Sequence, residues 1–294
     1  MAISQQTYAK IQLTNRRSGG FVMPIENGVG YGEYTEVKIE HLSKILAMHM
    51  AITQAVIKKH ASYYEPEYRY IDLTAGKGST PDGNSGSPIV FLDKASDPKF
   101  DIPFRADLIE REQDNIEALQ STISAHPMSA SKQGSIYFHH GEYEKVVPQL
   151  FKSKKDFELG LVYVDPSGDL PNFKTLAHVS NARPRMEILL YVSATNIKRQ
   201  FQQTQKFLAD FLNETGKQHW LIRRPFKGDS HQWTFLLGSN IDFFKPHKKI
   251  QTYFCILNSP EGQEVFEKMN LSQDQRMEQK QPRIPGSVDE KLHL

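Results

Sequence analysis

The feature that most constrains the fold of this chain is a regular alternation of strand-like and helix-like segments over residues 68–216. Each short run rich in apolar, aromatic and β-branched residues is followed by a longer segment with helical spacing. This alternation is typical of a parallel sheet, because parallel neighbours need a crossover, usually a helix, between them. The strand candidates are 68–73, 104–110, 134–141, 159–165 and 186–193.

Helices are expected before, between and after these strands. A long amphipathic helix is predicted over residues 35–60, where apolar residues recur mainly at steps of three and four. The remaining helix candidates are 86–95, 112–126, 143–151, 197–216 and 261–270.

Antiparallel signals replace this pattern near the C-terminus. Strand-like runs at 219–226 and 231–239 are joined by the short stretch KGDS, which predicts a hairpin, and a third run follows at 250–257. We therefore expect one α/β domain over residues 36–272, with its β-hairpin region at 218–258.

Both ends are expected to lie outside this domain. Residues 1–35 are polar and glycine-rich, which predicts an irregular N-terminal arm. Residues 273–294 are too polar to bury a core, which predicts a flexible tail.

Composition excludes several classes of protein. The net charge of +2 neither requires nor excludes a polynucleotide partner, so any basic surface must be local. Cys255 is the one cysteine, which excludes an internal disulfide framework and a cysteine-rich metal site within one chain. No stretch reaches the roughly 18 apolar residues of a membrane span, and no apolar signal segment opens the sequence. We therefore expect a cytoplasmic protein.

A glycine-rich loop follows the first predicted strand, in the stretch YIDLTAGKG. A Walker A phosphate loop would need a glycine at Ile71 and a hydroxyl at Gly78, and neither is present. A dinucleotide fingerprint would place its third glycine at Pro81 and begin a helix at once, which this sequence does not do. The loop therefore fits neither phosphate-binding pattern.

The same loop fits a nucleoside-binding role better. The spacing of Asp72, Gly76 and Gly78 is a reduced form of the loop of class I S-adenosylmethionine (SAM) methyltransferases. SAM has no phosphate, so bare glycine backbone is enough for close approach, and Asp72 can attract the methionine ammonium directly or through water. The predicted cofactor-binding residues here are Asp72, Thr74, Ala75, Gly76 and Gly78. The alternative is a plain turn after a strand.

Two more acidic residues stand at strand ends. Glu110 ends the second strand, where a carboxylate can accept from both ribose hydroxyls. Glu142 follows the third strand, where it can accept from the adenine amino group. Because the carboxyl ends of parallel strands share one edge, where open α/β sheets bind ligands, we expect Asp72, Glu110 and Glu142 to line one site.

The fourth strand ends in the predicted catalytic turn Asp165-Pro166-Ser167-Gly168. Its position matches a motif of amino-methyltransferases, in which Asp or Asn precedes two prolines and an aromatic residue and orients the target amine. Here Ser167 and Gly168 replace the second proline and the aromatic residue, so a stacking partner for a base must come from elsewhere. The structural alternative is an ordinary turn after a buried strand.

These segments together resemble the three-Cys-motif partner family, a bacterial group with a class I methyltransferase-like domain. The resemblance covers about residues 37–199 and rests on YIDLTAGKG, GSP, YVDPSG, MEILLYVS and NIKRQ. It implies a Rossmann-like α/β fold, with a mostly parallel sheet, helices on both faces and a C-terminal antiparallel hairpin. Ribosomal-RNA adenine methyltransferases share a similar Gly-Ser-Pro and strand-four layout, which suggests a nucleic-acid substrate by analogy.

Aromatic and cationic residues alternate in the predicted hairpin. Aromatic rings can stack on bases while cations hold phosphates. The predicted nucleic-acid-binding residues are Trp220, Arg223, Arg224, Lys227 and Trp233. The alternative places the tryptophans in the core and the charges on a solvated edge. No metal is expected at His139 and His140, because neighbours on a strand point to opposite faces.

The sequence thus favours a SAM-dependent methyltransferase that acts on DNA or RNA, with an adenine amino group as acceptor. A second hypothesis is a catalytically silent methyltransferase-like module that binds nucleic acid or a partner protein, which the altered turn at Ser167 and Gly168 supports. A small-molecule methyltransferase is a third hypothesis and would call for an apolar lid over the site.

Overall fold

The computed structural model describes residues 35–80, 83–127, 135–205, 207–242 and 244–270. The tail predicted at 273–294, and all but the last residue of the arm predicted at 1–35, lie outside these described residues.

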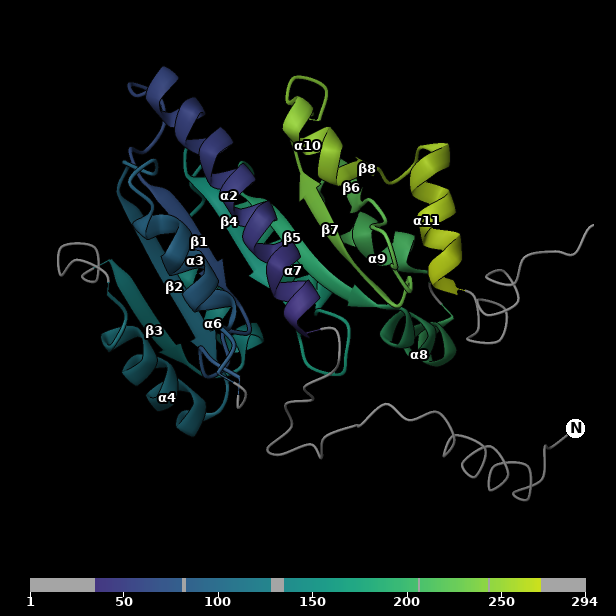
Figure 1. Ribbon diagram of the computed structural model, residues 1–294, viewed down its shortest axis with the longest axis horizontal. Coiled ribbons are helices and arrows are strands. Elements are labelled where there is room, and N and C mark those ends of the chain that lie inside the picture. Colours follow the sequence, from purple (N-terminus) through teal and green to yellow (C-terminus); the bar gives the residue numbers. More distant parts are fainter. Residues whose placement is uncertain (1–34, 81–82, 128–134, 206, 243, 271–294) are drawn as a thin grey trace, which may run out of the picture.

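One mixed sheet of eight strands forms the centre of the molecule, in the order β3-β2-β1-β4-β5-β7-β6-β8 (Figure 1). Strands β1 to β5 are parallel, whereas β7, β6 and β8 are antiparallel to their neighbours. This arrangement confirms the predicted fold class, including the C-terminal hairpin. The strands are β1 (Tyr68–Asp72), β2 (Phe104–Glu110), β3 (Ile136–His140), β4 (Leu159–Val164), β5 (Glu187–Ser193), β6 (His219–Arg223), β7 (Trp233–Ser239) and β8 (Phe254–Ile256).

Helices cover both faces of this sheet (Figure 1). One face carries α2 (Thr35–Lys59), α3 (Ser87–Ser96), α4 (Gln113–Ser124) and α10 (Lys248–Tyr253). The other carries α6 (Tyr143–Leu150), α7 (Phe173–Ala182), α8 (Ala194–Thr204), α9 (Leu208–Glu214) and α11 (Pro260–Asn270). Within the ranges described, no helix has both the length and the apolar character needed to cross a membrane.

Alternation of side chains along the strands divides the core into two layers. On β1, the Tyr70 ring stacks on Phe91 of α3, with ring centroids 4.1 Å apart, while Ile71 belongs to the apolar cluster on the other face. All six residues of β4 are buried, as expected for a central parallel strand covered on both sides. The sheet is therefore held between two apolar layers, which fixes the positions of the strand ends.

Three elements differ from the sequence-based expectation. The helix predicted over 197–216 is two helices, because Gln205 adopts a left-handed conformation with φ of 58° between α8 and α9. The strand predicted over 250–257 is mostly α10, with only the short β8 after it. Helix α7 was not predicted, although its cap is visible afterwards: the Asn172 side chain accepts from the Thr175 N–H.

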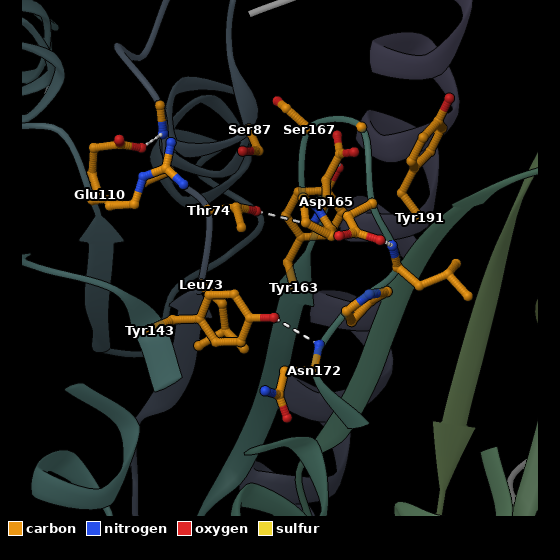
Figure 2. Close-up of a pocket in the computed structure, with 18 of the residues that line it drawn as sticks. Leu73, Thr74, Ser87, Glu110, Tyr143, Tyr163, Asp165, Ser167, Asn172 and Tyr191 are labelled. Atoms are coloured by element: carbon orange, nitrogen blue, oxygen red, sulfur yellow. Dashed lines mark hydrogen bonds between the residues drawn. The ribbon is translucent and has the colours of Figure 1, made fainter. Parts of the chain in front are cut away.

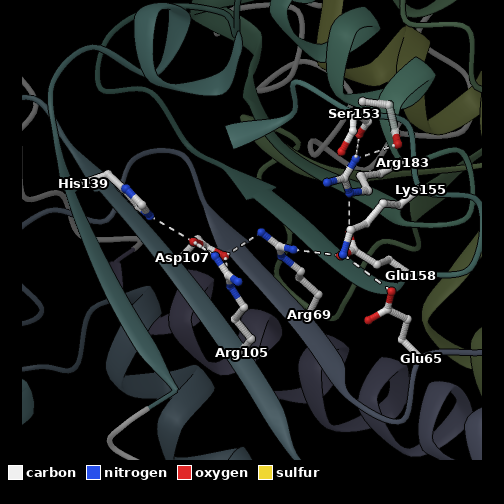
Figure 3. Close-up of polar contacts among 10 residues, drawn as sticks. Glu65, Arg69, Arg105, Asp107, His139, Ser153, Lys155, Glu158 and Arg183 are labelled. Atoms are coloured by element: carbon white, nitrogen blue, oxygen red, sulfur yellow. Dashed lines mark hydrogen bonds and ion pairs between the residues drawn. The ribbon is translucent and has the colours of Figure 1, made fainter. Parts of the chain in front are cut away.

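A buried ionic network crosses the sheet on the α6 and α7 face (Figure 3). Arg69 joins its two halves, with Nη1 2.9 Å from Glu158 Oε1 and Nη2 3.0 Å from Asp107 Oδ2. Glu158 also pairs with Arg183, and Asp107 with Arg105. Burial alone would raise the pKa of Asp107, but its bond to His139 and the two arginines lower it to about 2. Both acids are therefore held as carboxylates by surrounding cations.

Glu158→Gln tests the energetic weight of this network. The substitution keeps the shape but removes the counter-charge of buried Arg183 and one of the two carboxylates that pair with Arg69. We expect this to cost about 3–5 kcal/mol in unfolding free energy, measured by urea denaturation. Glu65→Gln is the matched control, because Glu65 is an exposed partner of Lys155 at 3.5 Å. It should cost less than about 1 kcal/mol. Equal losses in the two variants would contradict a special role for the buried network.

Candidate functional site

A cavity of about 1330 Å³ opens at the carboxyl edge of the parallel strands. The loops that follow β1, β2, β3 and β4 and the end of β5 supply its walls (Figure 2). It lies over β1 and β4, where the strand order reverses, which is the place where open α/β sheets bind ligands. Its volume exceeds the usual range for a single small ligand, about 300–1,000 Å³, so a nucleoside and a second reactant fit together.

The glycine loop after β1 is fixed to both neighbouring strands. The Leu73 N–H donates to the Tyr163 carbonyl of β4, and the Ala75 N–H donates to the Ile109 carbonyl of β2, each at 2.9 Å. Gly76 has φ of 62°, and a Cβ atom added there would point into open space rather than against protein atoms. The loop therefore presents bare backbone to the cavity.

Glu110 lies at the end of β2 beside this loop and faces the cavity (Figure 2). Its Oε2 accepts from the Gly76 N–H at 2.9 Å, and its Oε1 accepts from the Glu112 N–H at 2.9 Å and from Asn115 Nδ2 at 3.2 Å. A carboxylate offers about four acceptor sites, so capacity remains for one ligand hydroxyl. Glu110 thus lies at the cavity, and its binding of a hydroxyl stays a prediction.

Asp72 does not line the cavity, so the predicted contact between this side chain and a ligand is corrected to a supporting role. The carboxyl is fully buried behind the loop, where it accepts from the Thr74 N–H at 3.1 Å and from the Tyr70 hydroxyl at 3.0 Å. Burial raises the pKa of Asp72 to about 6, although hydrogen bonds from Ser87, Thr74 and Tyr70 oppose the rise. Its contacts shape the start of the loop from below.

The Asp165 turn closes the opposite side of the cavity (Figure 2). The Asp165 N–H donates to the Thr74 hydroxyl at 2.9 Å, which ties the two loops together. The Tyr163 hydroxyl donates to Asp165 Oδ2 at 3.1 Å, and Lys38 Nζ donates to the same oxygen at 2.8 Å. Pro166, Ser167 and Gly168 also line the cavity. The four predicted catalytic residues and the glycine loop are thus in one place.

The other predicted cofactor-binding residues differ in how far they are enclosed by the cavity. Thr74, Ala75 and Gly78 line the cavity with Gly76. Glu142 also lines it, but its side chain is exposed and pairs with Lys145, with Nζ 2.6 Å from Oε2. The hydrogen bond from Lys145 holds the pKa of Glu142 below its usual value. This acid is therefore a rim residue rather than an enclosed one.

The structure contradicts the predicted nucleic-acid role of three hairpin residues. Trp220, Arg223 and Trp233 are 8%, 2% and 2% exposed, so they have no free face for a base or a phosphate. The Arg223 guanidinium lies 4.4 Å from the Trp233 ring centroid, and its Nη2 pairs with Asp229 at 2.9 Å. The Arg223 guanidinium and the Trp233 ring therefore contact each other inside the fold. They are enclosed because the hairpin packs against α2, where His41 contacts Phe226 and Trp233.

The two remaining hairpin cations differ from each other. Arg224 Nε donates to the carbonyls of Gln251 and Phe254, at 2.7 and 3.0 Å, and the guanidinium pairs with Glu261. These bonds join β6 to the segment around α10 and β8. Lys227 is exposed at the turn and stays available to an outside partner.

Tyr191 and Lys38 are among the cavity residues that the sequence analysis did not identify. Tyr191 of β5 lines the cavity beside Asp165 (Figure 2), and its place near the carboxyl end of a strand is a signal that could have identified it. Lys38 belongs to α2, far from every motif, and its side chain gives no sequence signal beyond the polar side of an amphipathic helix. Only the packing of α2 against the sheet brings it to Asp165.

No family model matches the chain, and no curated protein matches it. Solved structures give distant likenesses. A DUF519-family protein from Legionella pneumophila is 12% identical, covers 78% of this chain and 93% of its own, and has a TM-score of 0.45. A spermidine synthase from Thermotoga maritima is 13% identical over 81% and 73%, with a TM-score of 0.43. The METTL16 MTase domain is 13% identical over 65% and 66%, with a TM-score of 0.39. The function is therefore argued from this chain's own residues.

The buried carboxyl of Asp72 predicts a specific pH dependence of stability. Because its pKa is raised in the folded protein, its stabilising contribution is present below about pH 4 and is lost as the pH rises through about 6. Asp72→Asn removes this titration. We expect the unfolding free energy of the variant, relative to that of the wild type, to rise by about 3 kcal/mol between pH 4 and 7, measured by urea denaturation.

Gln120→Ala, at an exposed position of α4, is the control, because it removes no titratable group. Its offset from the wild type should stay constant over the same range. A constant offset in Asp72→Asn as well would contradict the assignment of a buried, titrating carboxyl at this site.

Proposed function

We propose that this protein is a SAM-dependent methyltransferase that transfers a methyl group to an amino nitrogen. The observation that carries the proposal is the single cavity that unites the open glycine loop, the anchored carboxylate of Glu110 and the Asp165 turn. Each of these has a separate chemical task in such a reaction. Their placement over the reversal of strand order supports a nucleoside ligand.

The residues around the cavity fit SAM as a ligand. The space beside Gly76, which a Cβ atom would begin to fill, admits a ligand against bare backbone. Glu110 is oriented by three donors and keeps acceptor capacity for one ribose hydroxyl. Glu142 at the rim can accept from an adenine amino group. When bound, the cofactor supplies an electrophilic methyl group on a sulfonium.

The Asp165 turn would orient the acceptor. In the described part of the chain, Asp165 Oδ2 accepts from Tyr163 and Lys38, while Oδ1 has no hydrogen-bond partner. An acceptor N–H on Oδ1 would fix the direction of the nitrogen lone pair, and positioning of this kind can lower a barrier by several kcal/mol, about 3 or more. The Tyr191 ring in the same cavity offers the flat surface that Gly168 cannot provide.

For the substrate, we propose an adenine amino group of a nucleic acid, reached as a flipped or unpaired base. Two features support this substrate. The Asp165 carboxylate and the Tyr191 ring line the same cavity, and Lys227 is exposed on the hairpin. The loop and turn motifs also support membership of the three-Cys-motif partner family. The strand and helix pattern supports a domain over residues 36–272, and the sequence composition supports a cytoplasmic location. These finer assignments are proposals from the sequence.

Two specific observations favour the silent-module hypothesis. Lys38 already neutralises Asp165, and the turn lacks the aromatic residue of active amino-methyltransferases. SAM binding without methyl transfer to any acceptor would favour that hypothesis over the enzyme.

Glu110→Gln tests the cofactor site. The amide replaces one acceptor oxygen with a donor that opposes the N–H groups of Gly76, Glu112 or Asn115. We expect SAM affinity, measured by calorimetry, to fall by about 1–3 kcal/mol. Glu117 is an exposed acid of α4 that lies outside the cavity, so Glu117→Gln should bind SAM like the wild type. Unchanged affinity in folded Glu110→Gln would remove this residue from the cofactor site.

Asp165 variants test the orientation of the acceptor. With labelled SAM and mixed DNA and RNA, Asp165→Ala should retain SAM binding and lose transfer by on the order of a hundredfold or more. Asp165→Asn should keep partial activity, because an amide oxygen still accepts from an amine. Asp156→Ala, at an exposed position outside the cavity, is the control and should transfer normally. Full activity in folded Asp165→Ala would show that the turn is structural only.

A further inference from the structure

A primary amine of the chain itself reaches the catalytic turn. Lys38 on α2 places its Nζ 2.8 Å from Asp165 Oδ2, across 127 residues of sequence. The two side chains are 23% and 18% exposed, so the pair is largely enclosed. Lys38 lines the same cavity as Gly76 and Glu110. The amine therefore shares the enclosed space that would hold the methyl donor.

The surroundings of this amine are those of a bound ammonium substrate. Asp165 supplies the carboxylate, and the Tyr163 hydroxyl donates to the same oxygen at 3.1 Å. Lys38 Nζ lies 4.7 Å from the centroid of the Tyr191 ring, within the range of a cation–π contact. A carboxylate and an aromatic face recognise alkylammonium groups and their methylated forms alike. Because methylation keeps the charge of lysine, both contacts persist in the product.

Two other lysines, Lys145 and Lys44, lack this environment. Lys145 lines the cavity, but its side chain is 77% exposed and pairs with Glu142 at the rim. Lys44, two turns further along α2, pairs with Glu40 and is outside the cavity. Lys38 differs from both by its contact with the residue that orients the acceptor. Lys44 is therefore a natural internal reference for Lys38.

We propose that Lys38 is a methyl acceptor within its own chain. The inference rests on the proposed function. The Lys38 ammonium first loses a proton to solvent, which frees the lone pair on Nζ. That lone pair forms a bond to the methyl carbon of the sulfonium donor as the carbon–sulfur bond breaks. The electron pair of the broken bond stays on sulfur, which leaves a neutral thioether and a methylated lysine that carries one positive charge.

The decisive measurement is the mass of the peptide that contains Lys38. Purified protein is incubated with SAM, digested and compared with the protein before incubation. We expect an increase of about 14 Da per methyl group, confined to Lys38, in the wild type and in Lys44→Arg. Lys38→Arg should show no increase. Unmodified Lys38 in protein that binds SAM would overturn the inference, and a dependence of the rate on protein concentration would overturn transfer within one chain.

A second measurement needs no cofactor. An amine-selective acetylating reagent should modify Lys38 more slowly than Lys44, because Asp165 and Tyr191 shield its Nζ. Asp165→Asn should accelerate acetylation of Lys38 and leave that of Lys44 unchanged. Equal rates for the two lysines, with no response to Asp165→Asn, would overturn the placement of the ammonium.

The outcomes for the two proposals can be separated. Calorimetry with SAM and methyl transfer to DNA and RNA by the wild type and by Lys44→Arg report on the proposed function alone, because Lys44 lies outside the cavity. If SAM binds and the polynucleotide is methylated while Lys38 stays unmodified, only the inference about Lys38 fails. If SAM does not bind, both fail.

Discussion

The hydrogen bond from the Asp165 N–H to the Thr74 hydroxyl joins the two loops on which the site depends. It extends the pairing of β1 with β4 beyond the strands themselves, together with the bond from the Leu73 N–H to the Tyr163 carbonyl. β1 and β4 are neighbours at the reversal of strand order, so their loops leave in opposite directions and open a space between them. The glycine loop and the Asp165 turn face each other because of this one junction.

Buried carboxyl groups in and beside the sheet lie in two contrasting environments. Asp107 is bonded to His139 and arginines, and Glu158 to Lys155 and arginines, and these groups hold the pKa of each carboxyl below its usual value. Asp72 has no cation at hydrogen-bond distance among the described residues and is surrounded by hydroxyl and N–H donors. Burial then raises its pKa, because desolvation disfavours the charged form. The first group fixes strands β1, β2 and β4, and the second shapes the loop that would hold the ligand.

The hairpin shows how a composition typical of nucleic-acid binding can serve the core instead. Arg223 is enclosed by Trp233, Phe226 and Asp229, so its charge and the rings satisfy one another. Alternation of aromatic and cationic residues does not distinguish an outward face from an inward one. The orientation is decided by α2, whose His41 packs on the hairpin rings and whose Lys38 meets the catalytic turn.

The parallel sheet, the antiparallel hairpin and the positions of the loop and the Asp165 turn could be predicted from the sequence, because they follow from local periodicity and from glycine and acidic residues at strand ends. The separation of α8 from α9 could not, since the break at Gln205 is a single left-handed residue with no glycine to mark it. Tertiary packing is what places Asp72 behind the loop, Arg223 inside the fold and Lys38 in the site. Each of these depends on contacts between segments far apart in the chain, and such contacts leave no trace in the spacing of neighbouring residues.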